Sequence, residues 1–448
     1  MQQSTNNKRL VEIGIEGREP FRKWRESNYS ESLRDGKARL QRIDKFLPEI
    51  YGKIDGLEGY AIHVLQTLIR TQSVNSSPDG ERNVARFVAG ELEKLSFSTK
   101  SIEPEPNRVS VVGNLSFNGK EHPRVVFYAH TDTVPAGNIS EWNYPPFEGR
   151  LVDGKIFGRG AQDCKMGVAS SIVAARALTE SNIGISGTLS VAAAADEESG
   201  GHKGIHELIE AGLLGGDYGI YVESVPGEIH IAHNGMVWLK VTTRGESAHS
   251  SKKKSYTNAI LKMAKVVEAL DAMEFTNWKP HPLVPGGPYI SVNRIQGGSK
   301  ENMIPDECSI ICDIRTMPGQ TLKSVLDDVE GTLDRLRASD PKLNCETEIL
   351  TYGRAGEIPP SDPSVVFTQL AAERVIGAAP KAIGVTAQTD MRWAVYDAGL
   401  PMVIYSCGTP TWHVPNEYIV VEDYLNTVKI LCTVALMYML NYSSTSSA

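Results

Sequence analysis

The chain alternates strand-like and helix-like runs from about residue 57 onward, and this alternation constrains its fold more than any other feature. Apolar runs with strand character cover residues 124–130, 187–195 and 217–224, and helix-like runs cover residues 167–181 and 203–214. Alternation at this spacing is typical of an α/β domain with a largely parallel sheet. Ligands of such sheets bind beyond the carboxyl ends of the strands, so functional residues are expected there.

The pattern changes between residues 232 and 346. That stretch holds helix-like runs near residues 258–273 and 321–338 among several strand-like runs, which predicts a small α+β sandwich. The α/β pattern then returns and ends with a helix near residues 422–440. We therefore predict one α/β domain with a mostly parallel sheet, formed by residues 57–231 and 347–448. An α+β domain is inserted at 232–346, and residues 1–56 form an N-terminal extension.

Charge and cysteine usage exclude several functions. The formal net charge of -8 argues against nucleic acid or an anionic membrane surface as a partner. The longest late apolar run, "ILCTVALMYML", is too short to span a bilayer. Six cysteines without CxxC spacing are interpreted as free thiols of a cytoplasmic protein.

The segment "AAAADEESGG", residues 192–201, carries a strand-like run directly into three carboxylates. Carboxylates are rarely buried without a partner. Asp196, Glu197 and Glu198 therefore either lie in a solvated loop or face a cation.

Polar residues also follow other strand-like runs. His130 and Asp132 share one face of a strand, and a carboxylate beside an imidazole often orients a metal ligand. Asp163 lies in a Gly-rich loop ahead of a helix, where a helix N-cap is the simpler explanation. Glu223 ends a strand, and His413 lies in a loop after the strand "PMVIYS". Singly, each residue has an ordinary structural explanation.

Together, these residues place two imidazoles and four carboxylates at one edge of the predicted sheet. Such carboxylates raise one another's pKa unless cations neutralise them. Two divalent ions would balance Asp163, Glu198, Glu223 and a bridging hydroxide, which leaves one glutamate free for proton transfer. Mixed histidine and carboxylate ligation suits zinc, with cobalt or manganese as alternatives.

These motifs resemble the co-catalytic metallopeptidase and deacylase family that includes acetylornithine deacetylase, succinyl-diaminopimelate desuccinylase, aminoacylase and glutamate carboxypeptidase. The resemblance covers roughly residues 57–440 and rests on the order and spacing of "HTDTVP", "GRGAQDCKMG", "ADEESGG", "YVES", "GESAHSS", "NMIPDECSIICDIRTMPG", "TD" and "HVPNE".

The resemblance implies a role for each residue at the sheet edge. Asp163 would bridge two metals, with His130 and Glu223 completing one site, and Glu198 and His413 the other. Asp132 would orient His130, and Glu197 would be the general base and acid.

The inserted domain would be the family's dimerisation lid, so a homodimer or a higher oligomer is expected. His249 of "GESAHSS" would reach the partner subunit's active site and stabilise the oxyanion. Asn302 and Arg315 would hold a substrate carboxylate, for which an arginine fork is chemically suited. Gly408 of "SCGTP" would line the substrate pocket. The ordinary alternatives are a surface position for His249 and a pairing of Arg315 with Asp313.

The resulting hypothesis is a metal-dependent hydrolase of an amide-type C–N bond, which deacylates an N-acyl amino acid by attack of metal-bound hydroxide. Glutamate at position 223 is more typical of the family's deacylases than of its peptidases. Trp412 and the "SCGTP" turn depart from the family pattern, and the indole favours a bulky or aromatic substrate. The alternatives are a dipeptidase or carboxypeptidase, a hydrolase releasing an amine or ammonia from an aromatic amino acid, an enzyme with one metal, and a non-catalytic metal-binding protein.

Overall fold

The computed structural model describes residues 28–75, 77–223 and 227–440, which fold into two compact units. The α/β unit comprises the described parts of Arg18–Ile231 and Thr389–Ala448, together with Ile358–Ile383. The insert unit comprises Ala232–Glu357 and Gly384–Gln388. The predicted boundary at residue 346 falls inside a strand of the insert unit, β14 (Asn344–Gly353).

The α/β unit is built on one mixed sheet. Its strand order is β1 (Ser98–Glu105), β2 (Arg108–Phe117), β6 (Gly187–Ala194), β3 (Arg124–His130), β7 (Tyr218–Tyr221), β17 (Met402–Ile404) and β8 (Glu228–His233). The four strands from β6 to β17 are mutually parallel, whereas β1, β2 and β8 pair antiparallel. The α/β class is confirmed, but the expectation of a mostly parallel sheet holds only for the centre of the sheet.

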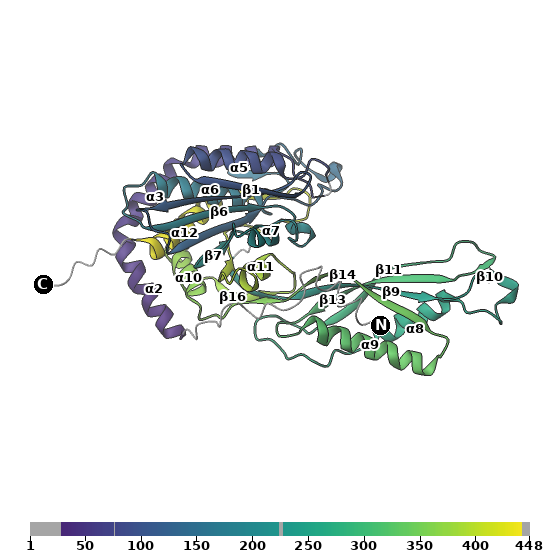
Figure 1. Ribbon diagram of the computed structural model, residues 1–448. Coiled ribbons are helices and arrows are strands. Elements are labelled where there is room, and N and C mark those ends of the chain that lie inside the picture. The colour runs from purple at the N-terminus through teal and green to yellow at the C-terminus, as the bar shows by residue number, and fades with distance from the viewer. Residues whose placement is uncertain (1–27, 76, 224–226, 441–448) are drawn as a thin grey trace. The chain divides into compact units, whose positions relative to one another are not determined.

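Helices cover both faces of this sheet (Figure 1). One face carries α4 (Glu58–Arg70), α5 (Arg82–Lys94), α6 (Lys165–Thr179) and α12 (Val421–Met439). The other face carries the short helices α7 (Ile205–Glu210) and α11 (Met391–Tyr396). Strand β6 is buried along its whole length, which explains its run of small apolar residues. A separate small sheet joins β18 (Tyr418–Val420), β5 (Lys155–Phe157) and β4 (Arg150–Val152).

Residues 29–56 form two helices that pack on the α/β unit, α2 (Tyr29–Ile43) and α3 (Leu47–Gly56), joined by the 3-10 turn Asp44–Phe46. The Ser32 hydroxyl donates to the Ser361 carbonyl over 2.8 Å, just before α10 (Pro363–Ile376). The hydroxyls of Tyr51 and Thr433 lie 2.8 Å apart, which ties α3 to α12. This part of the expected extension is therefore integral to the unit, and residues 1–27 lie outside the described chain.

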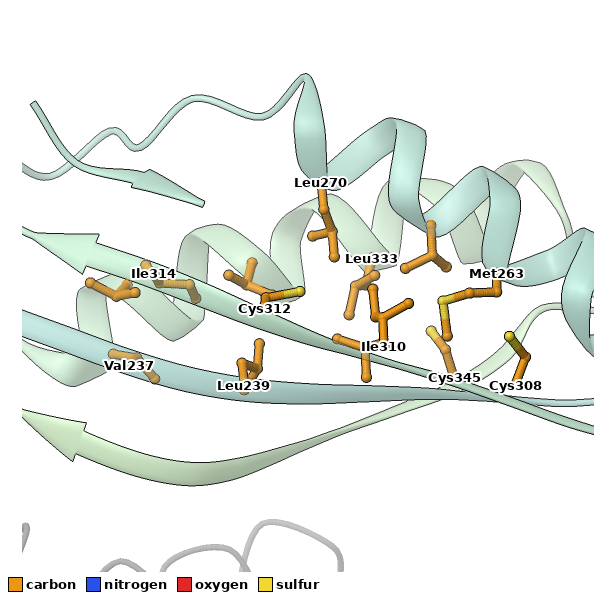
Figure 2. Close-up of a cluster of buried hydrophobic side chains, with 14 of the residues drawn as sticks. Val237, Leu239, Met263, Leu270, Cys308, Ile310, Cys312, Ile314, Leu333 and Cys345 are labelled. Atoms are coloured by element: carbon orange, nitrogen blue, oxygen red, sulfur yellow. The ribbon is translucent and has the colours of Figure 1, made fainter. Parts of the chain in front are cut away.

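The insert unit is an antiparallel sheet covered by two helices. Its strand order is β11 (Tyr289–Gly297), β13 (Glu307–Thr316), β9 (Gly235–Arg244) and β14, and its helices are α8 (Ala259–Asp271) and α9 (Leu322–Ser339). Figure 2 shows apolar and sulfur-containing side chains filling the space between the sheet and the helices. A two-stranded ribbon pairs β10 (Ala248–His249) with β12 (Met303–Ile304).

Two further short strands pair with β8. Strand β15 (Gly356–Glu357) pairs with Ala232 and His233 at the end of β8, and β16 (Lys381–Val385) also pairs with β8. All six cysteines are buried and free. Within the described ranges, no helix combines the length and apolar character needed to cross a bilayer.

Helix α6 approaches the sheet so closely that Gly167 has no room for a side chain. A Cβ built there would lie 1.8 Å from the carbonyl oxygen of Val222, just after β7. We expect Gly167→Ala to lower the free energy of unfolding by about 1–3 kcal/mol, because overpacking displaces backbone. In the matched control Gly90→Ala, α5 offers open space, so a gain of about 0.4–1 kcal/mol is expected. Urea denaturation measures both, and equal stability of Gly167→Ala and wild type would contradict the close approach.

Candidate metal centre

The ends of the central strands bring most of the predicted site residues to one edge of the sheet. Strands β3 and β6 pair in parallel with His130 opposite Ala194, so both strands end at the same edge of the sheet. Glu197 and Glu198 follow in a 3-10 turn that starts after Asp196, whose left-handed backbone (φ 68°) reverses the chain.

The remaining residues of the cluster come from three other connections. Asp163 directly precedes the N-cap of α6. Glu223 lies two residues after β7, and His413 lies between β17 and β18. Parallel strands with connections at their carboxyl ends thus explain why residues far apart in the sequence converge.

Asp163 stands at the centre of the cluster. Its Oδ1 lies 3.0 Å from Nε2 of His130, and its Oδ2 lies 3.1 Å from Nε2 of His413. The same nitrogen of His413 lies 3.3 Å from Oε1 of Glu198. Asp163, Glu198 and His413 each offer one ligand atom, and these atoms all lie within 4.8 Å of one another. One carboxylate that faces an imidazole with each oxygen has the arrangement that a bridging ligand needs.

His130 is fixed by its own strand end. Its Nδ1 lies 3.0 Å from the backbone carbonyl of Asp132 and 3.4 Å from the Oδ1 of that residue. A carbonyl oxygen only accepts, so Nδ1 carries a proton, and Nε2 points toward Asp163. Burial disfavours the charged ring, yet the neighbouring Cys164 sulfur and the Asp132 and Asp163 carboxylates hold the pKa of His130 well above its usual value.

The Asp132 carboxylate itself holds the backbone of the glutamate pair. Its Oδ1 accepts from the Glu197 amide and its Oδ2 from the Glu198 amide, both over 3.1 Å. The Asn75 side-chain amide also donates to Oδ2 over 2.8 Å. The Asp132 side chain, which is expected to orient His130, therefore also fixes the backbone of Glu197 and Glu198.

The charges of the cluster are not balanced by the described protein groups. Burial raises the pKa of Glu223 to about 7, and the charge of Asp163 adds to the effect. Burial also raises the pKa of Glu197 well above that of a solvated carboxyl. Hydrogen bonds to Asp163 and Glu198 raise the pKa of His413 to about 10.

Protons are therefore needed here unless cations take their place. In addition, the buried Oε2 of Glu223 has no hydrogen-bond partner among the described residues. Carboxylate and imidazole donors with an unpaired buried oxygen fit divalent metal ions.

Asp390 belongs to the same buried region, although the sequence indicated no role for it beyond the motif "TD". The Tyr128 hydroxyl donates to its Oδ2, and its buried Oδ1 finds no hydrogen-bond partner in the part of the chain that the structure describes. Its charge acts on Glu197. The following Arg392 donates to the Gly200 carbonyl over 2.6 Å, so this segment also holds the end of the "DEESGG" turn. Only the position of "TD" among the other motifs could have pointed to it.

Gly408 backs onto the loop of Asp163. A Cβ at Gly408 would lie 2.2 Å from Nε2 of Gln162, and the Thr409 amide donates to the Oε1 of that glutamine over 3.2 Å. Trp412 and Val414, on either side of His413, are exposed.

The other three predicted residues belong to the insert unit. His249 is exposed on β10, with its Nδ1 2.9 Å from the Ser251 hydroxyl. Asn302 lies beside it, since its carbonyl accepts from the Ser250 amide over 3.0 Å. Arg315 donates from Nε to Asp313 over 3.0 Å, which is the ordinary pairing that the sequence left open.

Arg315 lies at the opposite end of the insert unit from His249 and Asn302. His249 pairs with Met303, just before β13 begins, whereas Arg315 is the penultimate residue of β13. At about 3.3 Å per residue, the stretch from Glu307 to Arg315 spans about 26 Å. Figure 1 shows β10 beyond one end of the four-stranded sheet. One chain therefore cannot place Asn302 and Arg315 on the same small carboxylate.

Comparison with known proteins agrees with this architecture. The family model described as Peptidase family M20/M25/M40 matches residues 126–437. A deformylase of N-formyl-4-amino-5-aminomethyl-2-methylpyrimidine from Bacillus subtilis (strain 168) is 26% identical over 418 residues, covering 87% of this chain and 97% of the relative. A probable succinyl-diaminopimelate desuccinylase from Staphylococcus epidermidis is 27% identical over 282 residues, covering 57% of this chain and 68% of the relative.

Solved structures share the fold. Aminopeptidase PepT from Bacillus cereus superposes with a TM-score of 0.70 at 20% identity, covering 85% of this chain and 98% of the other. The Bacillus subtilis YXEP protein, described as a dinuclear metal binding peptidase, gives a TM-score of 0.62 at 18% identity, covering 86% and 98%.

Metal binding at this cluster should release protons in a pH-dependent way, because ligands bind in their deprotonated form. Glu223, with a pKa of about 7, holds a proton at pH 6 and not at pH 8.5, whereas His413, with a pKa of about 10, holds one at both. We expect cobalt(II) binding to release about one proton more per chain at pH 6 than at pH 8.5. The apparent affinity should rise with pH, because protons compete with the metal. Calorimetry in buffers of different ionisation enthalpy measures the release, and equal release at both pH values would contradict the protonated state of Glu223.

Proposed function

We propose, since this chain belongs to peptidase family M20/M25/M40, that it removes the acyl group from an N-acyl amino acid. The chain is a metal-dependent hydrolase of amide-type C–N bonds. The observation that carries the finer proposal is the position of Asp163 between the imidazoles of His130 and His413, with Glu198 also in contact with His413 and Glu197 next to it in the chain.

The names of two relatives support deacylation over peptide hydrolysis. One is a deformylase and one a probable desuccinylase, so each name describes removal of an acyl group. Residue 223 is a glutamate, the residue expected from the resemblance to deacylases. We infer that the substrate of this chain is likewise acylated on nitrogen. The role expected of Arg315 adds a carboxylate to that substrate.

Five residues are proposed as ligands of two divalent metals. Asp163 would bridge them, with His130 and Glu223 at one metal and Glu198 and His413 at the other. Zinc is favoured by the mixed imidazole and carboxylate set, and cobalt or manganese suits the same donors. When bound, the metals would lower the pKa of a water molecule and polarise the substrate carbonyl.

Glu197 is proposed to move the proton. Within the described residues, no histidine pairs with the Glu197 carboxyl group, and the Glu197 backbone is fixed by Asp132. Its raised pKa suits a group that must both take and return a proton. Glu197 would take a proton from water as the water oxygen attacks the carbonyl carbon. It would then give that proton to the leaving amine nitrogen as the C–N bond breaks.

A homodimer is proposed to complete the substrate site. His249 and Asn302 lie at one end of the insert unit and Arg315 at the other, so two chains are needed to bring both sets to one substrate. We propose that the partner subunit supplies His249 to hold the carbonyl oxygen and Asn302 to help hold the substrate carboxylate. Arg315 of the same chain would bind the carboxylate through its planar fork.

An aromatic substrate is the second candidate. Exposed Trp412 and Val414 flank His413, and the substrate named for the Bacillus subtilis relative contains a pyrimidine ring. Stacking on an indole would favour an acylated aromatic amine or aromatic amino acid.

We also propose a cytoplasmic location, since the six free cysteines are compatible with a reducing compartment.

The proposed function is tested with a panel of substrates and with Glu197→Gln. We expect metal-loaded wild type to hydrolyse N-formyl, N-acetyl, N-succinyl or N-aroyl amino acids faster than dipeptides or acylated aromatic amines. Glu197→Gln should keep both metals and lose about 10²–10⁴ in kcat, because it cannot shuttle a proton. The matched variant Glu198→Gln should lose metal instead. Faster turnover of dipeptides would favour the peptidase alternative, and loss of metal in Glu197→Gln alone would reverse the two assignments.

The shared site is tested by mixing variants. His249→Ala should keep metals and dimer and lose about 10²–10³ in turnover, the scale of one lost oxyanion donor. After subunit exchange with Glu197→Ala, one site of each hybrid dimer has its own Glu197 and receives His249 from the partner. Activity should then rise to at most about half of wild type per hybrid dimer, and to about a quarter in an equal mixture, since each hybrid has one complete site of two. No recovery despite demonstrated exchange would mean that His249 does not act in trans.

A further inference from the structure

Glu417 is a fully buried carboxylate that accepts four hydrogen bonds from the loop ending in Asp163. Its Oε2 accepts from Nη1 of Arg159 over 2.5 Å and from the Gly160 amide over 3.2 Å. Its Oε1 accepts from the Gln162 amide over 2.8 Å and from the Asp163 amide over 3.0 Å. The side chain therefore touches the backbone of the central residue of the metal cluster without facing the cluster itself.

Glu417 belongs to the segment that also carries His413. This segment continues into β18, which pairs with β5 so that Tyr418 stands opposite Phe157. The Gly158 amide donates to the Glu417 carbonyl over 2.9 Å. The two loops that face each other beyond this small sheet hold Asp163 and His413, whose Oδ2 and Nε2 lie 3.1 Å apart.

Strand pairing alone does not explain a carboxylate at this position. Burying a charge is costly unless it is paired and hydrogen-bonded, and an apolar replacement of a buried ion pair is often equally stable. The Glu417 carboxylate meets Arg159, whose side chain is only 3% exposed, and three backbone amides. What an apolar residue could not do is fix the amides of Gln162 and Asp163.

We propose that Glu417 is a positioning residue that fixes Asp163 relative to His413 and thereby sets the geometry of the shared metal ligand. The proposal rests on the metal ligands assigned above. Glu417 then has the same task as Asp132, whose carboxylate accepts from the amides of two successive residues, Glu197 and Glu198. Two connections from distant parts of the chain are thus aligned by carboxylates that bind no metal.

The bridging position makes Asp163 sensitive to small rotations. Its two oxygens lie at nearly equal distances, 3.0 and 3.1 Å, from two different imidazole nitrogens. A change at its backbone amide therefore moves one oxygen away from its site. Removing a group that orients a metal ligand typically weakens metal affinity by about 10–100-fold.

The test replaces Glu417 with glutamine in the full-length dimer. Glutamine has the same size, but its amide group would point N–H donors at backbone N–H donors. Metal affinity is measured by zinc competition with a chromophoric chelator, and metal content by elemental analysis. We expect two zinc ions per chain in wild type and a zinc affinity about 10–100-fold weaker in Glu417→Gln.

Glu91→Gln is the matched control. Glu91 is also a buried carboxylate, and it accepts from the Tyr60 hydroxyl over 2.6 Å, but its partners lie on α4 and α5 and not on a ligand loop. The control should lose thermal stability and keep wild-type zinc affinity. A purely structural role of Glu417 would give the same result as the control, so unchanged zinc affinity in Glu417→Gln overturns the proposal.

A second measurement covers the case in which Glu417→Gln does not fold. Hydrogen exchange of metal-free wild type should show the Gln162 and Asp163 amides protected to the same degree as those of β5, because their acceptor is a protein group and not the metal. Rapid exchange of these two amides would overturn the proposal. Wild type that binds no divalent metal would instead overturn the proposed function itself.

Discussion

The gathering of carboxylates at one buried sheet edge is the constraint on which this structure depends. Two kinds of protein group, backbone amides and imidazoles, offset part of the cost of burying these charges. Asp132 and Glu417 are held by backbone amides, and Asp163 is held by imidazoles. Glu223 keeps an unpaired buried oxygen and Glu197 keeps a raised pKa, so the protein groups described do not complete the balance. The remaining charge is what divalent cations would neutralise.

The arrangement separates carboxylates that hold backbone amides from side chains that face one another in the cluster. Two carboxylates accept amide hydrogen bonds: Asp132 holds the backbone of Glu197 and Glu198, and Glu417 holds that of Gln162 and Asp163. The side chains that face the cluster do not have to hold the backbone, so they can face a metal, a water molecule or a substrate. This division explains why several acidic residues crowd a region in which only some of them face one another.

The sequence predicted the convergence well because it depends on strand ends. His130 and the "DEE" segment follow strands that are visible as apolar runs, and parallel pairing brings them to the same edge. The antiparallel partners β2 and β8 left no comparable signal, so the sheet was expected to be more parallel than it is. The contacts of Asp132 with the Glu197 amide and of Glu417 with the Asp163 amide join residues that are 65 and 254 positions apart. A hydrogen bond to a backbone amide requires no particular residue type at the donor, so no sequence pattern reveals it.

The contact between Glu417 and Asp163 also has a consequence for the order in which the site can form during synthesis of the chain. Four of the five proposed ligands lie between residues 130 and 223, and a growing polypeptide contains them long before synthesis ends. His413, Glu417 and α12 arrive only with the last part of the chain. A ribosome-bound chain that has completed only its first half can therefore neither align Asp163 nor close the metal site. Under the proposed assignment, the ligands His130, Asp163 and Glu223 of one metal are synthesised early, whereas the second metal position also needs His413 from the last part of the chain.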